Sequence, residues 1–262
     1  MTIGSPKPAK ESPIKEEPLR FAGQSLQEKI DELVWEKAFF WIILSMVFIA
    51  VAGMEWCRWL FRTPPVPGFM TLIALLVAAI SAWRLIRLWP TLRRLAAGRK
   101  GERHVGELLD DLRAKGYRVF HDLVEDGYNI DHVAVGPTGL YAFETKTISK
   151  PTHGHATIVF DGQTVTVDGH TPDRDPVEQA RAAANRLAQI VAKSTGKTFP
   201  VRPVVFYPGW WVKPRSGADV WVLNPKMLFS YLKHEKTVLP EQDISLVAYH
   251  LERHIRAGER TQ

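Results

Sequence analysis

The sequence contains a single cysteine, Cys57, which lies in an apolar region. One thiol cannot form a disulfide framework or a cysteine-based zinc site, so both are excluded. No phosphate-binding glycine-rich loop, Ser/His/Asp arrangement or internal repeat stands out either. A chain of 262 residues has room for one globular domain and additional segments.

Acidic side chains are fewer than basic ones, and the formal net charge is +6. A basic excess suits a polyanionic partner, either nucleic acid or anionic lipid, and does not choose between them. Residues 1–20 contain few apolar side chains and four prolines, so they cannot bury enough surface to offset their ordering entropy. We therefore predict a disordered, cytoplasmic segment over residues 1–37. The first apolar block begins only at Ala38, which does not fit a cleavable signal peptide.

Two long runs lack charged side chains, 17 residues from Ala38 to Met54 and 21 residues from Thr63 to Trp83. As helices with a rise of ~1.5 Å per residue, they would span about 26 and 32 Å, close to the ~30 Å hydrocarbon core of a bilayer. Aromatic residues cluster at the ends of the runs, where amphipathic rings prefer the membrane interface. The sequence therefore predicts two transmembrane helices, at about 38–56 and 69–89. A pair of buried core helices is the alternative.

Lysine and arginine are unevenly distributed around these runs. The connector over residues 55–68 holds two, whereas the twenty residues after the second run hold seven. An excess of Lys and Arg marks the cytoplasmic side of a membrane protein. We expect a bacterial-type inner-membrane protein that contacts the lipid bilayer, crosses it twice and has both termini in the cytoplasm. The basic segment could also serve only as a topology anchor.

The pattern becomes globular from about Gly98, and we expect one domain over residues 98–262. Apolar residues at i, i+3, i+4 and i+7 predict a helix from Glu102 to Lys115. Glu102 falls on its core-facing side, where a carboxylate is costly unless it is paired or binds a metal. Alternatively, Glu102 only complements the helix dipole.

Two predicted strands, Ile130–Val135 and Leu140–Thr147, form a hairpin. If the loop is only Pro137-Thr138, Asp131 lies opposite Glu144, and Lys146 shares their face. A three-residue turn would shift this register by one. Two carboxylates at one point can hold Mg²⁺, and a nearby lysine can stabilise developing negative charge. The alternative is a salt-bridged strand end.

The order of several short motifs resembles the NERD (nuclease-related) family, a branch of the PD-(D/E)xK restriction-endonuclease-like superfamily. The motifs are Gly101-Glu102, Gly116-Tyr117-Arg118-Val119, Asn129-Ile130-Asp131-His132, Gly136-Pro137-Thr138-Gly139 and Phe143-Glu144-Thr145-Lys146. The resemblance covers about Gly98 to Val191. Ile130 stands where the superfamily motif has proline before the first acid, as in the NERD variant.

This resemblance implies an α/β fold with a restriction-endonuclease-like mixed sheet flanked by helices, here preceded by a two-helix transmembrane hairpin. It implies Asp131, Glu144 and Glu102 as ligands of Mg²⁺ or Mn²⁺, with Lys146 as the catalytic lysine. The family is assigned nuclease activity mainly by its site, so the fold is implied more firmly than the reaction.

Further candidates follow the first hairpin. Residues 157–160 and 164–167 predict a second hairpin, and Asp175-Pro176 predicts a helix start. Gln179 matches a family glutamine, although Ala183 stands where some related nucleases have tyrosine. Trp210, Trp211 and Lys213 could contact nucleic acid by stacking, or be packing residues. His153 and His155 could bind a metal, although such pairs in loops usually do not.

The remaining patterns predict a central strand at Val201–Phe206, a further strand at Val220–Leu223 and a closing helix from Asp243 to Arg256. Together, these features favour a membrane-anchored, metal-dependent nuclease that hydrolyses phosphodiester bonds in DNA, with RNA as an alternative. One competing interpretation is a catalytically silent module that binds nucleic acid or protein at the membrane. The other is a structural membrane protein whose basic segment binds lipid.

Overall fold

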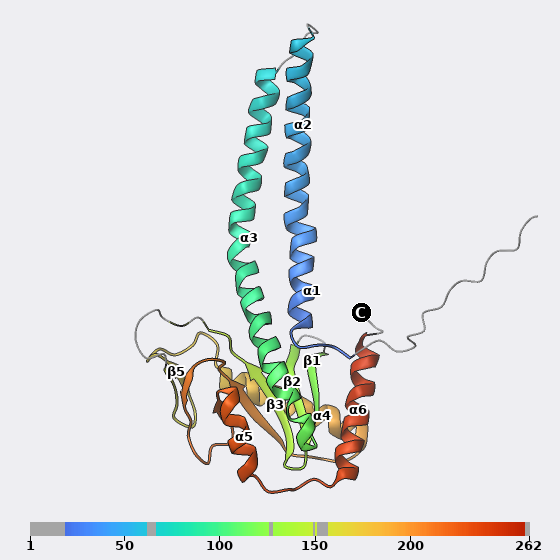
Figure 1. Cartoon of the computed structure of the whole chain (residues 1–262), viewed down its shortest axis with the longest axis vertical. Helices are drawn as coiled ribbons and strands as arrows, with labels where there is room; N and C mark the ends of the chain where they lie inside the picture. Colours follow the sequence, from blue (N-terminus) through green and yellow to red (C-terminus); the bar gives the residue numbers. More distant parts are fainter. Residues whose placement is uncertain (1–18, 62–66, 126–127, 149, 151–156, 260–262) are drawn as a thin grey trace, which may run out of the picture.

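A computed structural model describes residues 19–61, 67–125, 128–148, 150 and 157–259. The predicted disorder of residues 1–18 and the candidate ligands His153 and His155 lie outside these ranges. Two long helices stand side by side on an α/β domain, and both join the domain at the same end (Figure 1).

The first long helical stretch consists of α1 (Gln24–Glu32), the π-helix η1 (Leu33–Phe39) and α2 (Phe40–Leu60), and the second is α3 (Pro67–Asp110). Both are long and apolar enough to cross a membrane. Most of their large apolar side chains are exposed, among them Met46, Ile49, Leu72 and Leu76. This exposure does not fit the alternative of two buried core helices.

Two predictions about these segments are wrong. Residues 24–37 were predicted as disordered but are helical, because the segment before them docks onto the domain. The second apolar helix and the helix beginning at Glu102 were predicted as separate, but α3 is continuous over 44 residues. Most of the residues that join them are good helix formers, such as leucine, alanine and arginine, so only Pro90, Gly98 and Gly101 oppose continuation of the helix.

The main sheet has the strand order β1-β2-β3-β6-β8. β1 (Arg118–Glu125), β2 (Tyr128–Gly136) and β3 (Gly139–Thr145) are antiparallel neighbours, and β3, β6 (Val201–Phe206) and β8 (Trp221–Leu223) are parallel. The sheet is therefore mixed. β6 lies between β3 and β8, which confirms that it is an interior strand.

The predicted register of the first hairpin is confirmed. Val135 pairs with Leu140 and His132 pairs with Phe143, so the loop is Pro137-Thr138. Asp131 and Glu144 are the next residues along the two strands.

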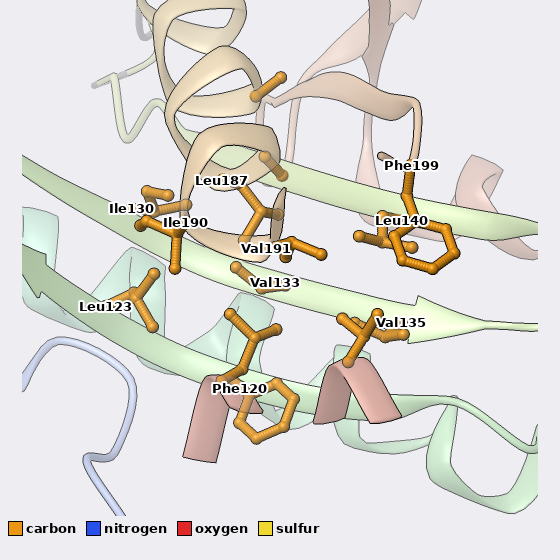
Figure 2. Close-up of a cluster of buried hydrophobic side chains, with 14 of the residues drawn as sticks. Phe120, Leu123, Ile130, Val133, Val135, Leu140, Leu187, Ile190, Val191 and Phe199 are labelled. Carbon is orange, nitrogen blue, oxygen red and sulfur yellow. The ribbon is translucent and has the colours of Figure 1, made fainter. Parts of the chain in front are cut away.

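Helices cover both faces of this sheet. α4 (Pro176–Thr195) and α6 (Glu241–Glu259) pack on one face, where Leu187, Ile190 and Val191 meet Ile130, Val133 and Leu140 (Figure 2). The end of α3 and α5 (Pro225–His234) pack on the other. Asp175 caps α4 by accepting hydrogen bonds from the backbone N–H groups of Val177 and Glu178, as predicted from the Asp-Pro pair.

A smaller sheet has the strand order β5-β4-β7. β4 (Thr157–Phe160) and β5 (Val165–Val167) form the predicted second hairpin, and β7 (Trp211–Lys213) adds parallel to β4. The predicted fold class is thus confirmed at the level of architecture: two long N-terminal helices, followed by mixed sheets flanked by helices.

Candidate active site

The site is built where α3 passes the carboxyl end of β3. A Cβ atom on Gly101 would lie 1.7 Å from Oγ1 of Thr147, so only glycine allows the helix to approach this closely. Glu102 is the next residue of α3 after this close contact. The glycine therefore sets the position of the helix-borne acid relative to the strand end.

Glu102 is buried, as predicted from the spacing of the apolar residues along its helix. Its side chain lies in the interior of the domain. Its Oε2 atom has no hydrogen-bond partner in the described part of the chain. Burial raises the pKa of Glu102 to about 8, and the charges of Asp122 and Glu144 add to this effect. Burying an ionised carboxylate in this position costs folding free energy unless a cation or a proton neutralises the charge.

Asp131 lies in the first half of β2, beside the carboxyl end of β3, and its Oδ2 atom accepts a hydrogen bond of 2.7 Å from the backbone N–H of Thr145. Burial raises the pKa of Asp131 well above its usual range. The negative charges of Glu144 and Glu102 raise it further. Three carboxylates, carried by α3, β2 and β3, are thus close enough for their charges to act on one another.

Lys146 supplies a positive charge at the same place. Its Nζ atom donates hydrogen bonds of 2.6 Å to Oε1 of Glu144 and of 2.6 Å to Oε1 of Gln179. The backbone N–H of Lys146 also donates to the carbonyl of Phe206, which fixes the chain against β6. The charge of Lys146 favours the ionised forms of Glu102 and Asp131. The structure therefore brings together Glu102, Asp131, Glu144, Lys146 and Gln179.

The oxygen donors of this site suit a hard divalent cation such as Mg²⁺ or Mn²⁺. Glu102 offers a buried oxygen without a partner, and a cation would offset the repulsion among the three carboxylates. In the described ranges, however, no three His, Cys, Asp or Glu side chains are close enough together to form a ready metal site. The donor types therefore fit the ion, while the side chains are not in a ligating arrangement.

The tryptophan pair does not act as one unit. Trp210 is 3% exposed, belongs to a buried cluster and donates from its indole nitrogen to the carbonyl of Ile148 at 3.1 Å. The interpretation of Trp210 as a nucleic-acid contact is wrong, because a buried ring has no face free for a base. Trp211 is 68% exposed, and Lys213 is exposed beside it on β7.

Sequence reasoning missed Asp122. This residue is fully buried in β1, has a positive φ of 53°, and its charge acts on Glu102. Its carboxylate accepts hydrogen bonds from Arg20, Ser25 and Asn129. Asp122 follows His121 in a run of strand-forming residues, and nothing in its immediate neighbours shows that its partner lies near the N-terminus.

Comparison with known proteins agrees with this geometry. Residues 97–208 match the family model NERD, nuclease-related domain. No curated protein and no solved structure matches the chain. The matched range begins five residues before Glu102 and includes Asp131, Glu144, Lys146 and Gln179, whereas α1, α2, α5 and α6 lie outside it. Residues 97–208 are therefore similar to the nuclease-related domain family.

Proposed function

We propose that the protein is a metal-dependent nuclease that hydrolyses phosphodiester bonds in DNA, with RNA as the alternative substrate. The observation that carries this proposal is the group of three mutually interacting carboxylates, Glu102, Asp131 and Glu144, with Lys146 at the same strand end. Strongly shifted pKa values arising from burial and from specific neighbouring charges are characteristic of functional sites.

Asp131, Glu144 and Glu102 would hold the ion, Mg²⁺ or Mn²⁺. When bound, such an ion polarises a phosphate and lowers the pKa of a coordinated water. The negative charges of these carboxylates in turn limit how many further anionic groups the site can bind.

Lys146 would act on the substrate itself. Its ammonium is held between Glu144 and Gln179, so its direction is fixed before the substrate arrives. An ammonium group in this position can donate a hydrogen bond to a phosphate oxygen and stabilise the negative charge that develops as water attacks. Gln179 has the narrower role of orienting Lys146.

We also propose that α2 and the first part of α3 cross the bacterial inner membrane, with the domain and both termini in the cytoplasm. Their exposed apolar side chains and the lysine and arginine excess around them support this topology. Docking of Arg20 onto the domain supports it as well, because the segments before α2 and after α3 must then lie on one side.

The second candidate is a catalytically silent module that binds nucleic acid or protein at the membrane. The observation in its favour is the close pair of Glu144 and Lys146, 2.6 Å apart, which resembles a structural salt bridge. In that case the pair would contribute little to stability and nothing to cleavage.

The deciding experiment is cleavage of a supercoiled plasmid, and in parallel of an RNA, by the full chain in detergent with Mg²⁺ or Mn²⁺. We expect wild-type cleavage, with a loss of at least about a hundredfold in Glu144→Gln and Lys146→Ala. Metal binding, measured by the shift in Tm, should weaken in Glu144→Gln and persist in Lys146→Ala. Glu107→Gln and Lys236→Ala change exposed residues of the same types and should remain active.

Equal inactivity of the wild type and both site variants, without a metal-dependent shift in Tm, would favour the silent module. Reporter fusions at residue 30, at residue 65 and at the C-terminus test the topology separately. A C-terminal fusion that reports an extracytoplasmic position would overturn it.

A further inference from the structure

A cavity of about 440 Å³ lies between the two long helices, about midway along α3. Its walls come from η1, α2 and α3. The side chains that matter for its chemistry are Lys37, Trp41, Trp83, Arg84, Arg87 and Thr91. Three cations and a hydroxyl thus surround one space, with two indole rings beside them.

The indole rings help to hold the guanidinium groups at this cavity. The Arg87 guanidinium lies 4.0 Å from the centre of a Trp83 ring, and that of Arg84 lies 5.4 Å from Trp41 and 5.6 Å from Trp83. Such cation–π contacts orient a cation without neutralising it. In the described part of the chain, no carboxylate forms an ion pair with Lys37, Arg84 or Arg87. The cavity therefore keeps a net positive charge.

The backbone around Lys37 is unusual as well. Residues 33–39 form a π-helix, a rare conformation that is often found at functional sites. It lies between two α-helical segments, directly before the uncharged run of α2. The wider helix changes the direction in which Lys37 and the following turn face α3, which lines the other side of the cavity.

The cavity also lies at a defined level along the helices. The uncharged run of α3 ends at Trp83, and Arg84 and Arg87 follow within the next turn. Under the proposed topology, this is where the hydrocarbon region gives way to the lipid headgroups on the cytoplasmic side. Tryptophan prefers this interface, and basic pockets between membrane helices at this level bind anionic headgroups.

From these observations we propose that the cavity binds the headgroup phosphate of an anionic phospholipid. Arg84, Arg87 and Lys37 bind the phosphate, Thr91 supplies a hydroxyl, and the acyl chains lie against the exposed apolar side chains of α2 and α3. The proposal rests on the membrane anchoring proposed above and is independent of nuclease activity.

The same helix offers a control for non-specific charge. Arg93, Arg94 and Lys100 are exposed on α3 but do not line the cavity. Lys37→Gln/Arg84→Gln/Arg87→Gln and Arg93→Gln/Arg94→Gln/Lys100→Gln each remove three positive charges. A general attraction between a basic segment and an anionic surface depends on the charges near that surface. It therefore predicts a clear loss in the control variant too, through Arg93 and Arg94, which lie about 6 and 8 Å beyond Trp89 along the helix.

The experiment reconstitutes the full chain and both triple variants in phosphatidylcholine vesicles, with or without a minor fraction of phosphatidylglycerol. Trp35, Trp56, Trp59 and Trp89 are also exposed on these helices and are replaced with phenylalanine in all three proteins. Quenching of the remaining tryptophan fluorescence by brominated phosphatidylglycerol, against brominated phosphatidylcholine, then reports lipid at Trp41 and Trp83. We expect the cavity variant to need at least about tenfold more phosphatidylglycerol for half-maximal quenching, whereas the control variant changes little.

Equal loss in the two triple variants would overturn the proposal, since charge alone would then explain the binding. Displacement of the brominated lipid by soluble glycerol phosphate at similar concentration would overturn it too, because the site would then bind a free phosphate compound. Resistance to carbonate extraction from pure phosphatidylcholine vesicles is measured for all three proteins. Failure of the wild type in that assay would refute the membrane anchoring itself, and with it the lipid site.

Discussion

Arg20 and Asp122 form a buried ion pair that ties the segment before α1 to the main sheet. The Nε and Nη2 atoms of Arg20 each lie 2.8 Å from Oδ2 of Asp122, and the two side chains are 5% and 0% exposed. The backbone N–H and the hydroxyl of Ser25 donate to the same carboxylate at 2.9 and 2.6 Å. The α/β domain is therefore completed by residues outside the range that matches the nuclease-related family model.

Replacing Arg20 with methionine should destabilise the domain by about 3–5 kcal/mol, because Asp122 would remain as a buried charge without its cation. The double variant Arg20→Met/Asp122→Asn removes both charges and should regain most of this loss. The measurement is thermal unfolding of the full chain in detergent, followed by circular dichroism. A single variant that unfolds at the wild-type temperature would show that the pair is not important for stability.

Gly101→Ala should lower both stability and cleavage. A methyl group there meets the side chain of Thr147, and an overpacked contact of this kind costs about 1–3 kcal/mol. The helix must then move away from β3 and take Glu102 with it. Gly53→Ala is the matched control, since nothing lies within 4 Å of that position and alanine favours the helix.

The second variant Thr147→Gly removes the obstructing side chain, so Gly101→Ala/Thr147→Gly should recover activity at least in part. The measurements are Tm and the rate of plasmid cleavage. If Thr147→Gly gives no relief, the close contact at Gly101 is not the cause of the loss.

The stability of the metal-free protein should fall as pH rises from about 4.5 to 8. Burial, with the charges of Asp122 and Glu144, raises the pKa of Glu102 to about 8. In this range the folded state still binds a proton that the unfolded state has released, so each rise in pH favours unfolding. Glu102→Gln removes the titrating group without changing its shape, and its Tm should therefore fall less over this range.

The comparison requires chelator in every sample, because a bound cation would oppose the same effect. With Mn²⁺ added, the wild type should gain stability above pH 7, whereas Glu102→Gln should gain less. Parallel pH profiles for the two proteins would contradict the prediction.

Gln179→Ala should lower the cleavage rate by about tenfold and leave Tm nearly unchanged, because it removes one of the two groups that hold Lys146. Gln179→Glu replaces the amide with a carboxylate, which would bind the Lys146 ammonium more tightly and keep it away from a substrate phosphate. This variant therefore tests how strongly Lys146 should be held at position 179. Gln189→Ala, on the exposed face of the same helix, is the control. An unchanged rate in Gln179→Ala would show that Glu144 alone positions Lys146.

Substitutions of the two adjacent tryptophans should have different effects, one on nucleic-acid binding and the other on stability. Trp211→Ala should weaken binding of single-stranded DNA by about fivefold or more, as expected for loss of one stacked base, with little change in Tm. Trp210→Ala should instead lower Tm strongly, because it opens a cavity in the buried cluster. Fluorescence anisotropy with a labelled oligonucleotide measures binding. Unaltered binding by Trp211→Ala would exclude the small sheet from the interface.

The parts of the fold that the sequence predicts well are those set by local rules. The loop Pro137-Thr138 fixes the hairpin register, and with it the meeting of Asp131 and Glu144, through side-chain alternation. Asp175-Pro176 marks the start of α4 because a capping side chain and a proline act within one turn.

The parts that were missed depend on distant contacts. Arg20 and Asp122 are 102 positions apart in the sequence, which hides their pairing, and this pairing helps to anchor the N-terminal helix to the domain. The continuity of α3 was missed because the pattern changes from an apolar run to a globular one near Gly98, although the helix continues through Pro90 and Gly98. Trp210 was misread because it lies in the bend directly before β7 and packs into a buried cluster, whereas Trp211, the first residue of the strand, is exposed.

The unbroken course of α3 fixes how far the site stands from a bilayer. From Trp89 to Glu102 there are 102 − 89 = 13 residues, and a rise of ~1.5 Å for each gives about 20 Å. If Trp89 marks the membrane interface, the carboxylates lie at that height above it. The potential of a charged surface decays over a Debye length of about 8 Å at physiological ionic strength, so at about 20 Å less than roughly a tenth remains. Under the proposed membrane anchoring, the helix would thus hold the site beyond the range in which anionic lipids repel a nucleic acid strand.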